Sequence, residues 1–333
     1  MKITITILKI LLFIAIIIAL IQFNIIEIPS LSFFSGQTSN IFIIFFLISV
    51  NIILGAYKWW LLLKTFKYNI SYKICYLLYS VGVFFNSIMP GGFGGDIIKG
   101  TYLYKYIQTD YRTQSILTII VDRIVGMHAL FTICLFSGIF VSRNIMIENP
   151  VNNILNLLIV ITFLILVILG IVIFRANNLK ELVEKRINIK SIRFKDIIIK
   201  LLIALTRYKE KKISLLICWM ISITNHLVLI FCFYIMAHIL NIFILNLNTI
   251  TFISSSSLLA NYIPITPGGI GVGEGTFNYL FISLLENNTV LDNVAFGSIF
   301  FITYRIIFTL TSILLGGISF IMLKKPNYTI TNS

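Results

Sequence analysis

The sequence PGGFGGD at residues 90–96 interrupts an otherwise apolar stretch at residues 74–107. A helix cannot continue through this cluster, because proline lacks the amide hydrogen and glycine disfavours the helical state. Backbone that is not helical inside a membrane must find its hydrogen bonds in surrounding protein or in a water-filled cavity. We therefore predict that residues 74–107 form a re-entrant or broken helical hairpin.

A second cluster of the same kind, PGGIGVGE at residues 267–274, interrupts the apolar stretch at residues 249–286. Both clusters contain the pattern Pro-Gly-Gly-X-Gly, and each leads into an acid, Asp96 or Glu274. Another shared feature is an Arg-Ile dipeptide after each hairpin, which begins at Arg123 and at Arg305. These parallels predict a second hairpin at residues 249–286 and an internal repeat.

The composition of the chain places it in a membrane. Only 11% of its 333 residues are charged and 58% are apolar, whereas about 25% of the residues of a soluble domain are charged. Six stretches are long enough to cross a bilayer as helices, which takes about 20 residues: they lie at 4–26, 40–63, 113–142, 151–174, 213–240 and 294–323. We predict an all-α polytopic membrane protein with six full transmembrane helices and two hairpins in one integral membrane domain, residues 1–333. The first span is expected to stay as an uncleaved anchor, because no cleavage site follows it.

The basic residues indicate how the chain is oriented. If the N-terminus is cytoplasmic and each hairpin enters and leaves on one side, all but three of the 26 Lys and Arg residues, Lys58 and Lys99 included, lie on the cytoplasmic side. This distribution satisfies the positive-inside rule. It predicts a multi-pass protein of the cytoplasmic (inner) cell membrane with both termini in the cytoplasm and a basic cytoplasmic loop at residues 175–212. Three tryptophans are expected at the cytoplasmic interface as anchors: Trp59, Trp60 and Trp219.

With this orientation the two halves that contain the hairpins, residues 40–142 and 213–323, are inverted copies of one another. The first hairpin enters from the cytoplasmic side and the second from the external side. Inverted repeats with broken helices are typical of alternating-access transporters, whose substrate site lies near the midplane between the halves. The pattern therefore indicates a transport function.

Five ionisable residues fall inside the apolar segments or at the hairpin breaks: Asp96, Asp122, Arg123, Glu274 and Arg305. Each costs roughly 2.5–3.5 kcal/mol at a helix centre, so these residues must pair, cap a helix or face a hydrated cavity. Asp96 and Glu274 each open a helical stretch, where a carboxylate can cap free N–H groups. Alternatively, the two helix starts form anion or proton sites.

For Arg123 and Arg305, ion pairs with these carboxylates and binding of a phosphate group both fit the residue type, because a guanidinium holds either partner through two hydrogen bonds. Adjacent residues on a helix do not face each other, so Asp122 is not expected to neutralise Arg123. We predict that all five residues form the substrate-binding site.

No motif for catalysis or for a cofactor occurs in the sequence. The glycine clusters fit neither a P-loop nor a GxGxxG turn, and HExxH is absent. The four cysteines lie in or beside apolar runs and are interpreted as small hydrophobic residues. We expect no catalytic residue, no enzyme activity, no metal and no cofactor. In a membrane protein the net charge of +14 does not predict binding to nucleic acid.

Three segments together resemble a known family: NSIMPGGFGGDIIKG at 86–100, VDRIVG at 121–126 and NYIPITPGGIGVGEGTF at 261–277. Over nearly its whole length the chain is similar to the transmembrane region of lysyl-phosphatidylglycerol synthase/flippase proteins. The resemblance implies a lipid or lipid-linked substrate, and it implies that the soluble synthase domain of the longer members is absent here. It points to Asp96, Asp122, Arg123 and Glu274, and to the hairpin residues Pro90, Gly91, Gly92, Gly94, Gly95, Pro267, Gly268, Gly269 and Gly271.

From these observations we expect a flippase-like lipid translocase. Its expected partners are membrane lipids, either an anionic phospholipid or a polyprenyl-phosphate-linked substrate, and a separate synthase or glycosyltransferase would also fit. Two alternatives stay open. One is a membrane-embedded transferase that acts on lipid-phosphate-linked substrates, and the other is a non-transporting membrane partner of envelope or glycan synthesis.

Overall fold

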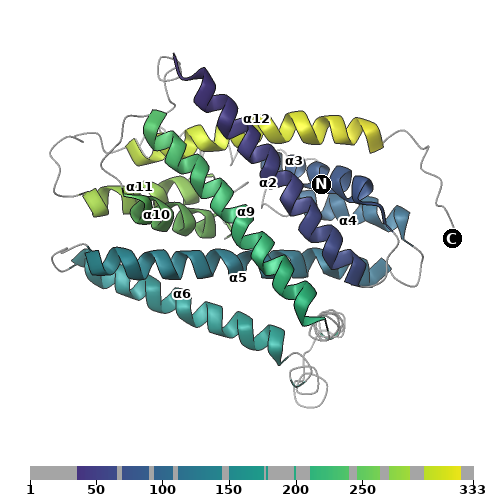
Figure 1. Cartoon of the computed structure of the whole chain (residues 1–333), viewed down its shortest axis with the longest axis horizontal. Coiled ribbons are helices and arrows are strands. Elements are labelled where there is room, and N and C mark those ends of the chain that lie inside the picture. Colours follow the sequence, from purple (N-terminus) through teal and green to yellow (C-terminus); the bar gives the residue numbers. More distant parts are fainter. Residues whose placement is uncertain are drawn as a thin grey trace, which may run out of the picture.

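The structure is a computed structural model, and it describes residues 36–65, 70–89, 94–107, 112–144, 150–175, 211–239, 246–262, 270–285 and 296–323, with the single residues 178 and 199. In this part of the chain all regular structure is helical (Figure 1). The helices are α2 (Thr38–Thr65), α3 (Tyr72–Ile88), α4 (Gly94–Tyr106), α5 (Arg112–Asn144), α6 (Pro150–Phe174), α9 (Lys212–Ile239), α10 (Leu247–Ala260), α11 (Val272–Leu285) and α12 (Phe296–Leu323).

The α-helical membrane class is confirmed. Four segments of the described part are long and apolar enough to cross a membrane: Thr38–Thr65, Ile116–Ser142, Ile213–Ile239 and Gly297–Leu323. The predicted span at 151–174 corresponds to α6, whose described apolar core Asn156–Ile168 is shorter. The predicted first span, residues 4–26, lies outside the described residues, and the count of six spans stays a prediction.

Both predicted helix breaks are present. The first lies between α3, which ends at Ile88, and α4, which begins at Gly94; the second lies between α10, which ends at Ala260, and α11, which begins at Val272. Polar caps fix where each hairpin starts, because an oxygen of the capping side chain satisfies a free N–H of the first turn. Ser71 caps α3 and Asn246 caps α10. Six of the hairpin residues lie outside the described residues: Pro90, Gly91, Gly92, Pro267, Gly268 and Gly269.

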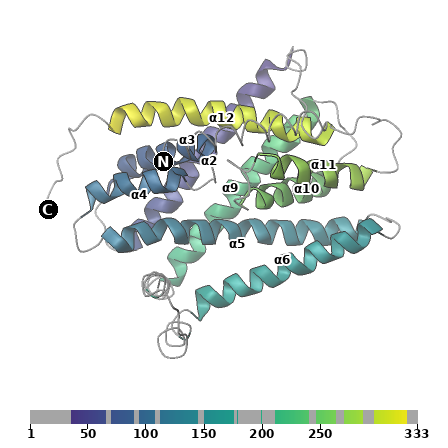
Figure 2. The same cartoon turned by 180° about the vertical axis from the view of Figure 1, so that it is seen from behind.

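Eight of the nine helices of the described residues form two units of four, α2 to α5 and α9 to α12, and each unit carries one hairpin; α6 packs against α5. Figures 1 and 2 show the α3–α4 hairpin at one end of the molecule and the α10–α11 hairpin at the other end. The units pack across each other, because α3 lies against α12, α10 lies against α5, and α2 lies along α9. The helices α2 and α9 run in opposite directions, since Asn51 contacts Asn225 while Cys218, earlier in α9, contacts Lys58, later in α2.

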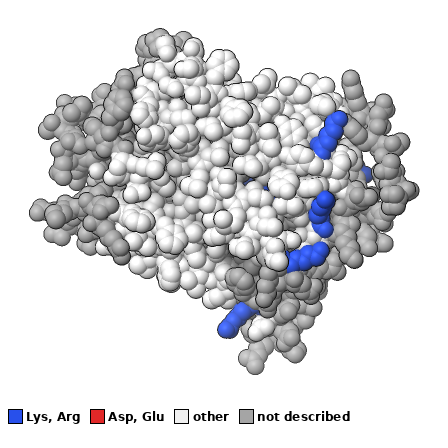
Figure 3. Space-filling view, viewed as in Figure 1, with Lys and Arg blue, Asp and Glu red and all other residues white. Residues whose placement is uncertain are grey.

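Exposed basic side chains gather at one end of the molecule (Figure 3). The exposed cations of the described residues lie at or next to helix ends: Lys64, Lys73, Lys105, Arg175 and Lys211. The described carboxylates, in contrast, are all withdrawn from the surface, so no acidic side chain balances this basic end within the described part of the chain. The predicted basic loop at 175–212 lies almost entirely outside the described residues.

Three residues that the sequence analysis placed on the cytoplasmic side, two lysines and a tryptophan, are buried inside the protein. Lys58 and Lys99 are only 5% and 2% exposed, so they do not belong to the exposed basic surface. Both are buried because each ammonium reaches a carboxylate inside the protein. Trp59 is fully buried and its indole N–H donates to the Thr118 hydroxyl at 3.1 Å. Its prediction as an interface anchor was therefore wrong.

Candidate functional site

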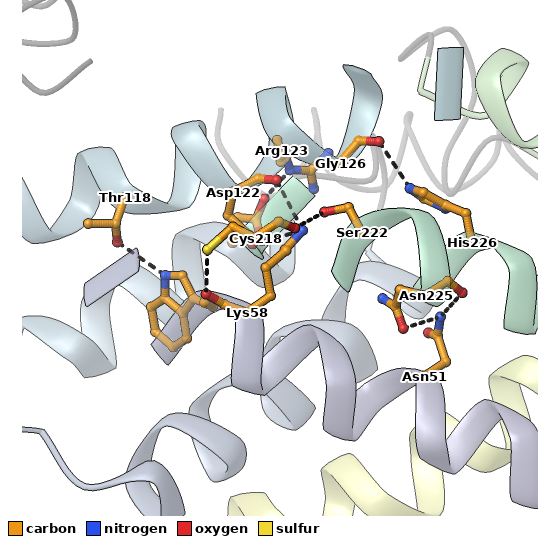
Figure 4. A network of polar contacts seen from close by, with 12 residues as sticks. Asn51, Lys58, Thr118, Asp122, Arg123, Gly126, Cys218, Ser222, Asn225 and His226 are labelled. Atoms are coloured by element: carbon orange, nitrogen blue, oxygen red, sulfur yellow. Dashed lines mark hydrogen bonds and ion pairs between the residues drawn. The ribbon is translucent and has the colours of Figure 1, made fainter. Parts of the chain in front are cut away.

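A polar cavity of about 320 Å³ lies between the two units. Its walls come from both hairpins and from α2, α5, α9 and α12, and part of it is shown in Figure 4. Of the five predicted site residues, four line this cavity: Asp96, Asp122, Arg123 and Arg305. The fifth, Glu274, forms an ion pair with Arg305 and is fully buried. The structure therefore brings together residues that are far apart in the sequence.

The first unit contributes an ion pair between its hairpin and α5. The Arg123 Nε donates to the Asp96 carboxylate, and Lys99 Nζ lies 3.6 Å from the other oxygen of the same carboxylate. Asp96 lies in the first turn of α4, where the unpaired N–H groups favour a negative charge. The turn itself is held by Asn86, whose side-chain oxygen accepts from the Gly95 N–H at 2.8 Å. The negative charge of Asp96 is thus stabilised by the N-terminal end of the α4 dipole and by two cationic side chains.

The second unit repeats this arrangement between α11 and α12. Arg305 Nε lies 2.5 Å from one Glu274 oxygen and Arg305 Nη2 donates to the other at 3.1 Å, which makes a fork-like pair. The same Nη2 also donates to the Asn261 carboxamide oxygen at 3.2 Å. Glu274 in turn accepts from the Gly271 N–H at 2.9 Å, where the φ of +86° suits glycine. The cap and the ion pair, considered as separate roles for Glu274, are both present.

Asp122 binds a different cation from its neighbour Arg123. Its carboxylate lies 3.0 Å from Lys58 Nζ, and the same ammonium donates to the Asp122 carbonyl oxygen at 3.2 Å (Figure 4). Both side chains are less than a tenth exposed. The separation of Asp122 and Arg123 follows from their adjacent positions on α5, which point them to different sides of the helix. A buried pair of this kind leaves a costly unpaired charge if either partner is removed.

Sequence reasoning missed Lys58 and Lys99 as site residues, although a signal was present for each. Lys58 is followed by the apolar run WWLLL before the chain reaches Lys64, so it lies well inside its span. Lys99 is three residues after Asp96 on the same helix, and that spacing brings two side chains together. Both lysines had been attributed to the positive-inside pattern, which hid their role in the interior.

A pair of asparagines that the sequence did not indicate joins the two units. The Asn51 amide donates to the side-chain oxygen of Asn225 at 2.9 Å and to its carbonyl oxygen at 3.0 Å. Asn51 is thirteen residues after the first residue of α2, and Asn225 is thirteen residues after the first residue of α9. Next to them, a ring nitrogen of His226 lies 3.0 Å from the Gly126 carbonyl oxygen. These contacts join α9 to α2 and to α5 at the wall of the cavity (Figure 4).

The two halves of the site differ in character. Two positions that are charged in the first unit are aromatic at the matching places of the second: Phe277 follows Glu274 by three residues as Lys99 follows Asp96, and Tyr304 precedes Arg305 as Asp122 precedes Arg123. Phe277 and Tyr304 both contact Phe233, with ring centroids 5.6 and 4.3 Å apart. The first unit therefore carries most of the charge, and an aromatic cluster fills the second.

The site as a whole holds a surplus of positive charge. Its described ionised side chains are four cations and three carboxylates, which leaves one positive charge in excess. A surplus of positive charge in a cavity enclosed by protein favours an anion, because charges interact more strongly there than in bulk water. A single phosphate diester would neutralise it.

Comparison with known proteins fits this architecture. The lysylphosphatidylglycerol synthase TM region family matches residues 6–316, a range that contains every residue of the site. The chain belongs to this family. A relative is the UPF0104 membrane protein MJ1078 of Methanocaldococcus jannaschii, which is 27% identical over 245 residues, 73% of this chain and 95% of the relative. The lysylphosphatidylglycerol synthase TM region is thus the shared element, and the family resemblance predicted from the glycine clusters is confirmed.

Proposed function

We propose that the protein is a lipid translocase that moves an anionic phospholipid or a lipid-linked anionic headgroup across the cytoplasmic membrane. The observation that carries the proposal is the shared cavity, into which each unit contributes an arginine, Arg123 or Arg305, held by a carboxylate of its own hairpin. A phosphate group can replace a carboxylate as the bidentate partner of a guanidinium. The headgroup would occupy the cavity while the tails remain in the membrane.

The two units act as an inverted repeat in this proposal. Several observations support the repeat: the hairpins lie at opposite ends, α2 and α9 are antiparallel, and each helix contact within one unit has a counterpart in the other. The acid and arginine pairs also correspond, Asp96 with Arg123 and Glu274 with Arg305. Inverted repeats suit alternating access, in which one unit rocks against the other around a fixed site.

The ion pairs give the site a means to release its substrate. With the cavity empty, each arginine is neutralised by a carboxylate rather than left as an unpaired buried charge, which would be strongly destabilising. When a phosphate enters, it competes with the carboxylates for the same N–H groups. The net binding free energy is therefore the difference between two similar interaction energies. Such a balance keeps binding weak enough for the headgroup to leave on the other side.

The basic end in Figure 3 supports the membrane orientation that we propose. Cytoplasmic surfaces of membrane proteins are enriched in Lys and Arg, so in this proposal the basic end faces the cytoplasm. The α3–α4 hairpin then enters from the cytoplasmic side and the α10–α11 hairpin from the external side.

A reconstitution tests the proposal. Purified protein is placed in liposomes that contain phosphatidylglycerol with a fluorescent acyl chain, and movement between leaflets is followed by quenching of the outer leaflet. We expect movement of phosphatidylglycerol but not of zwitterionic phosphatidylcholine. Arg305→Gln should slow the movement roughly tenfold or more, since it removes a charge-assisted hydrogen bond. Lys105→Ala, which removes an exposed cation outside the cavity, should leave the rate unchanged.

Other outcomes would sink the proposal in distinct ways. A chemically altered lipid without movement between leaflets would favour the membrane-embedded transferase. Neither movement nor chemistry, with polyprenyl phosphate tested as a second lipid, would favour a non-transporting partner. Equal movement with wild-type protein and Arg305→Gln would show that the cavity does not bind the headgroup.

A further inference from the structure

A second hollow lies on the outside of the molecule between α4 and α5. It is a groove of about 510 Å³ whose lining includes four isoleucines, together with Tyr104 and Thr101. Its apolar side chains are open to the surroundings, since Ile97 is 67% exposed, Ile116 is 40% exposed and Ile120 is 38% exposed. In a membrane such a surface faces hydrocarbon. The groove is therefore suited to an apolar chain rather than to a water-soluble ligand.

The groove exists because α4 carries a glycine at the place where α11 carries a side chain. Four residues after its acid, α4 has Gly100, whereas α11 has Asn278. Asn278 closes the corresponding space in the second unit: its side-chain oxygen accepts from the Ser298 N–H at 3.3 Å, and its Cα would lie 2.7 Å from a Cβ added to Gly297. A Cβ added to Gly100 would meet only Ile119 and Ile116, at ordinary distances of 3.5 and 4.0 Å.

The groove and the central cavity share one boundary. Asp96 and Arg123 belong to the walls of both hollows, so their ion pair stands between an apolar groove and a polar cavity. This juxtaposition matches an amphiphile, whose headgroup and tail need opposite surroundings within a short distance. The cavity, at about 320 Å³, is at the lower end of the range for small-molecule pockets, about 300–1,000 Å³. It has room for a headgroup, and the tails must lie elsewhere.

We propose that the groove between α4 and α5 binds an acyl chain of the phospholipid whose headgroup occupies the central cavity, with the Asp96 and Arg123 pair at the junction of tail and headgroup. This inference rests on the proposed function for the location of the headgroup. It commits to a glycerophospholipid with one net negative charge, because the surplus in the cavity is one positive charge. The glycine at position 100 of α4, where α11 carries Asn278 bonded to α12, assigns tail binding to the first unit.

Photochemical labelling tests the inference without requiring transport. The full chain is reconstituted in nanodiscs with phosphatidylglycerol that carries a diazirine near the middle of one acyl chain. After irradiation, labelled peptides are identified by mass spectrometry. We expect labelling of α4 and α5 around Ile97, Ile116 and Ile120 to exceed that of exposed α12 residues such as Ile313. The excess should fall roughly tenfold when the probe is phosphatidylcholine, which lacks the net negative charge.

A pair of glycine variants provides the matched control. Gly100→Phe fills the groove and should remove the excess labelling on α4 and α5. Gly317→Phe makes the same change on α12 at a position where an added Cβ meets nothing within 4 Å, and it should leave that labelling intact. The comparison of two lipids on wild-type protein keeps the test valid if the groove variant fails to fold.

Uniform labelling of all exposed helices, or equal labelling by the two phospholipids, would overturn the inference, because ordinary surrounding lipid gives that result. Preferential labelling by a polyprenyl phosphate diazirine over phosphatidylglycerol would overturn the choice of an acyl chain. Groove labelling without movement between leaflets would refute the translocase and leave the tail site standing. Movement between leaflets without groove labelling would refute the tail site and leave the translocase standing.

Discussion

The buried pair of Lys58 and Asp122 gives the sharpest prediction for stability. Removing one partner of a buried ion pair costs about 3–5 kcal/mol, because the other charge remains without compensation. Both side chains are under a tenth exposed, and Lys58 Nζ has the Asp122 carboxylate at 3.0 Å and the Asp122 carbonyl oxygen at 3.2 Å. Lys58→Met leaves an unpaired carboxylate, so we expect a loss near the upper end of that range. Asp122→Asn keeps an acceptor for the ammonium, so about 3 kcal/mol is expected.

The double variant carries the decisive information. Lys58→Met combined with Asp122→Asn removes both charges, and replacement of a buried pair by neutral groups is often nearly neutral. We expect the free energy of unfolding of the double variant to lie within about 1 kcal/mol of that of the wild-type protein. The free energy of unfolding is measured by SDS titration in mixed micelles, followed by tryptophan fluorescence, since the buried Trp59 adjoins Lys58. The control Lys105→Met removes only an exposed cation over Tyr102 and should cost at most about 1 kcal/mol.

Two results would refute this reasoning. Single variants that each cost less than about 1 kcal/mol would mean that the pair is hydrated rather than buried. Costs that simply add in the double variant would mean that the two residues do not interact, because residues in contact show coupling in a double-mutant cycle.

Two further predictions concern close contacts between helices, one within the first unit and one between the units. Gly95→Ala should destabilise the first hairpin by about 1–3 kcal/mol in thermal unfolding, because its Cβ would collide with the Gly82 carbonyl oxygen; Gly317→Ala, with open space around it, should not destabilise the protein, and equal effects would contradict the packing. Asn51→Leu should cost about 0.6–1.7 kcal/mol in SDS titration through loss of the bonds to Asn225, and an unchanged unfolding curve would contradict that contact.

Much of the fold could be predicted from the sequence because membrane spans and glycine clusters have strong local signatures. The boundaries of α2 and α12 lie within about two residues of the predicted spans, since hydrophobicity alone decides where a helix can cross hydrocarbon. Both breaks were also predictable, because proline and glycine act through their own backbone and need no tertiary partner.

The candidate site was only partly predictable. Acids next to the breaks were visible as exceptions in an apolar sequence, and the structure pairs Asp96 with Arg123. Lys58 was hidden, because a lysine near a span end has the same local signal whether it snorkels to the interface or turns inward. Only the position of Asp122 on another helix decides between these outcomes. The Asn51 contact with α9 likewise depends on the packing of two helices far apart in sequence.

The shared midpoint of α2 and α9 has a geometric consequence for measurement. Two antiparallel helices that contact each other at their centres can rotate about that contact, so a relative rotation moves the helix ends and leaves the central contact in place. Thirteen residues of helix span about 20 Å, so a rotation of about 10° between the two helices would separate their ends by roughly 3.5 Å while the Asn51 to Asn225 bond keeps its length. The distance between spin labels placed near Thr38 and Ile239 would therefore change most on such a rotation. The distance between labels placed beside Asn51 and Asn225 would hardly change.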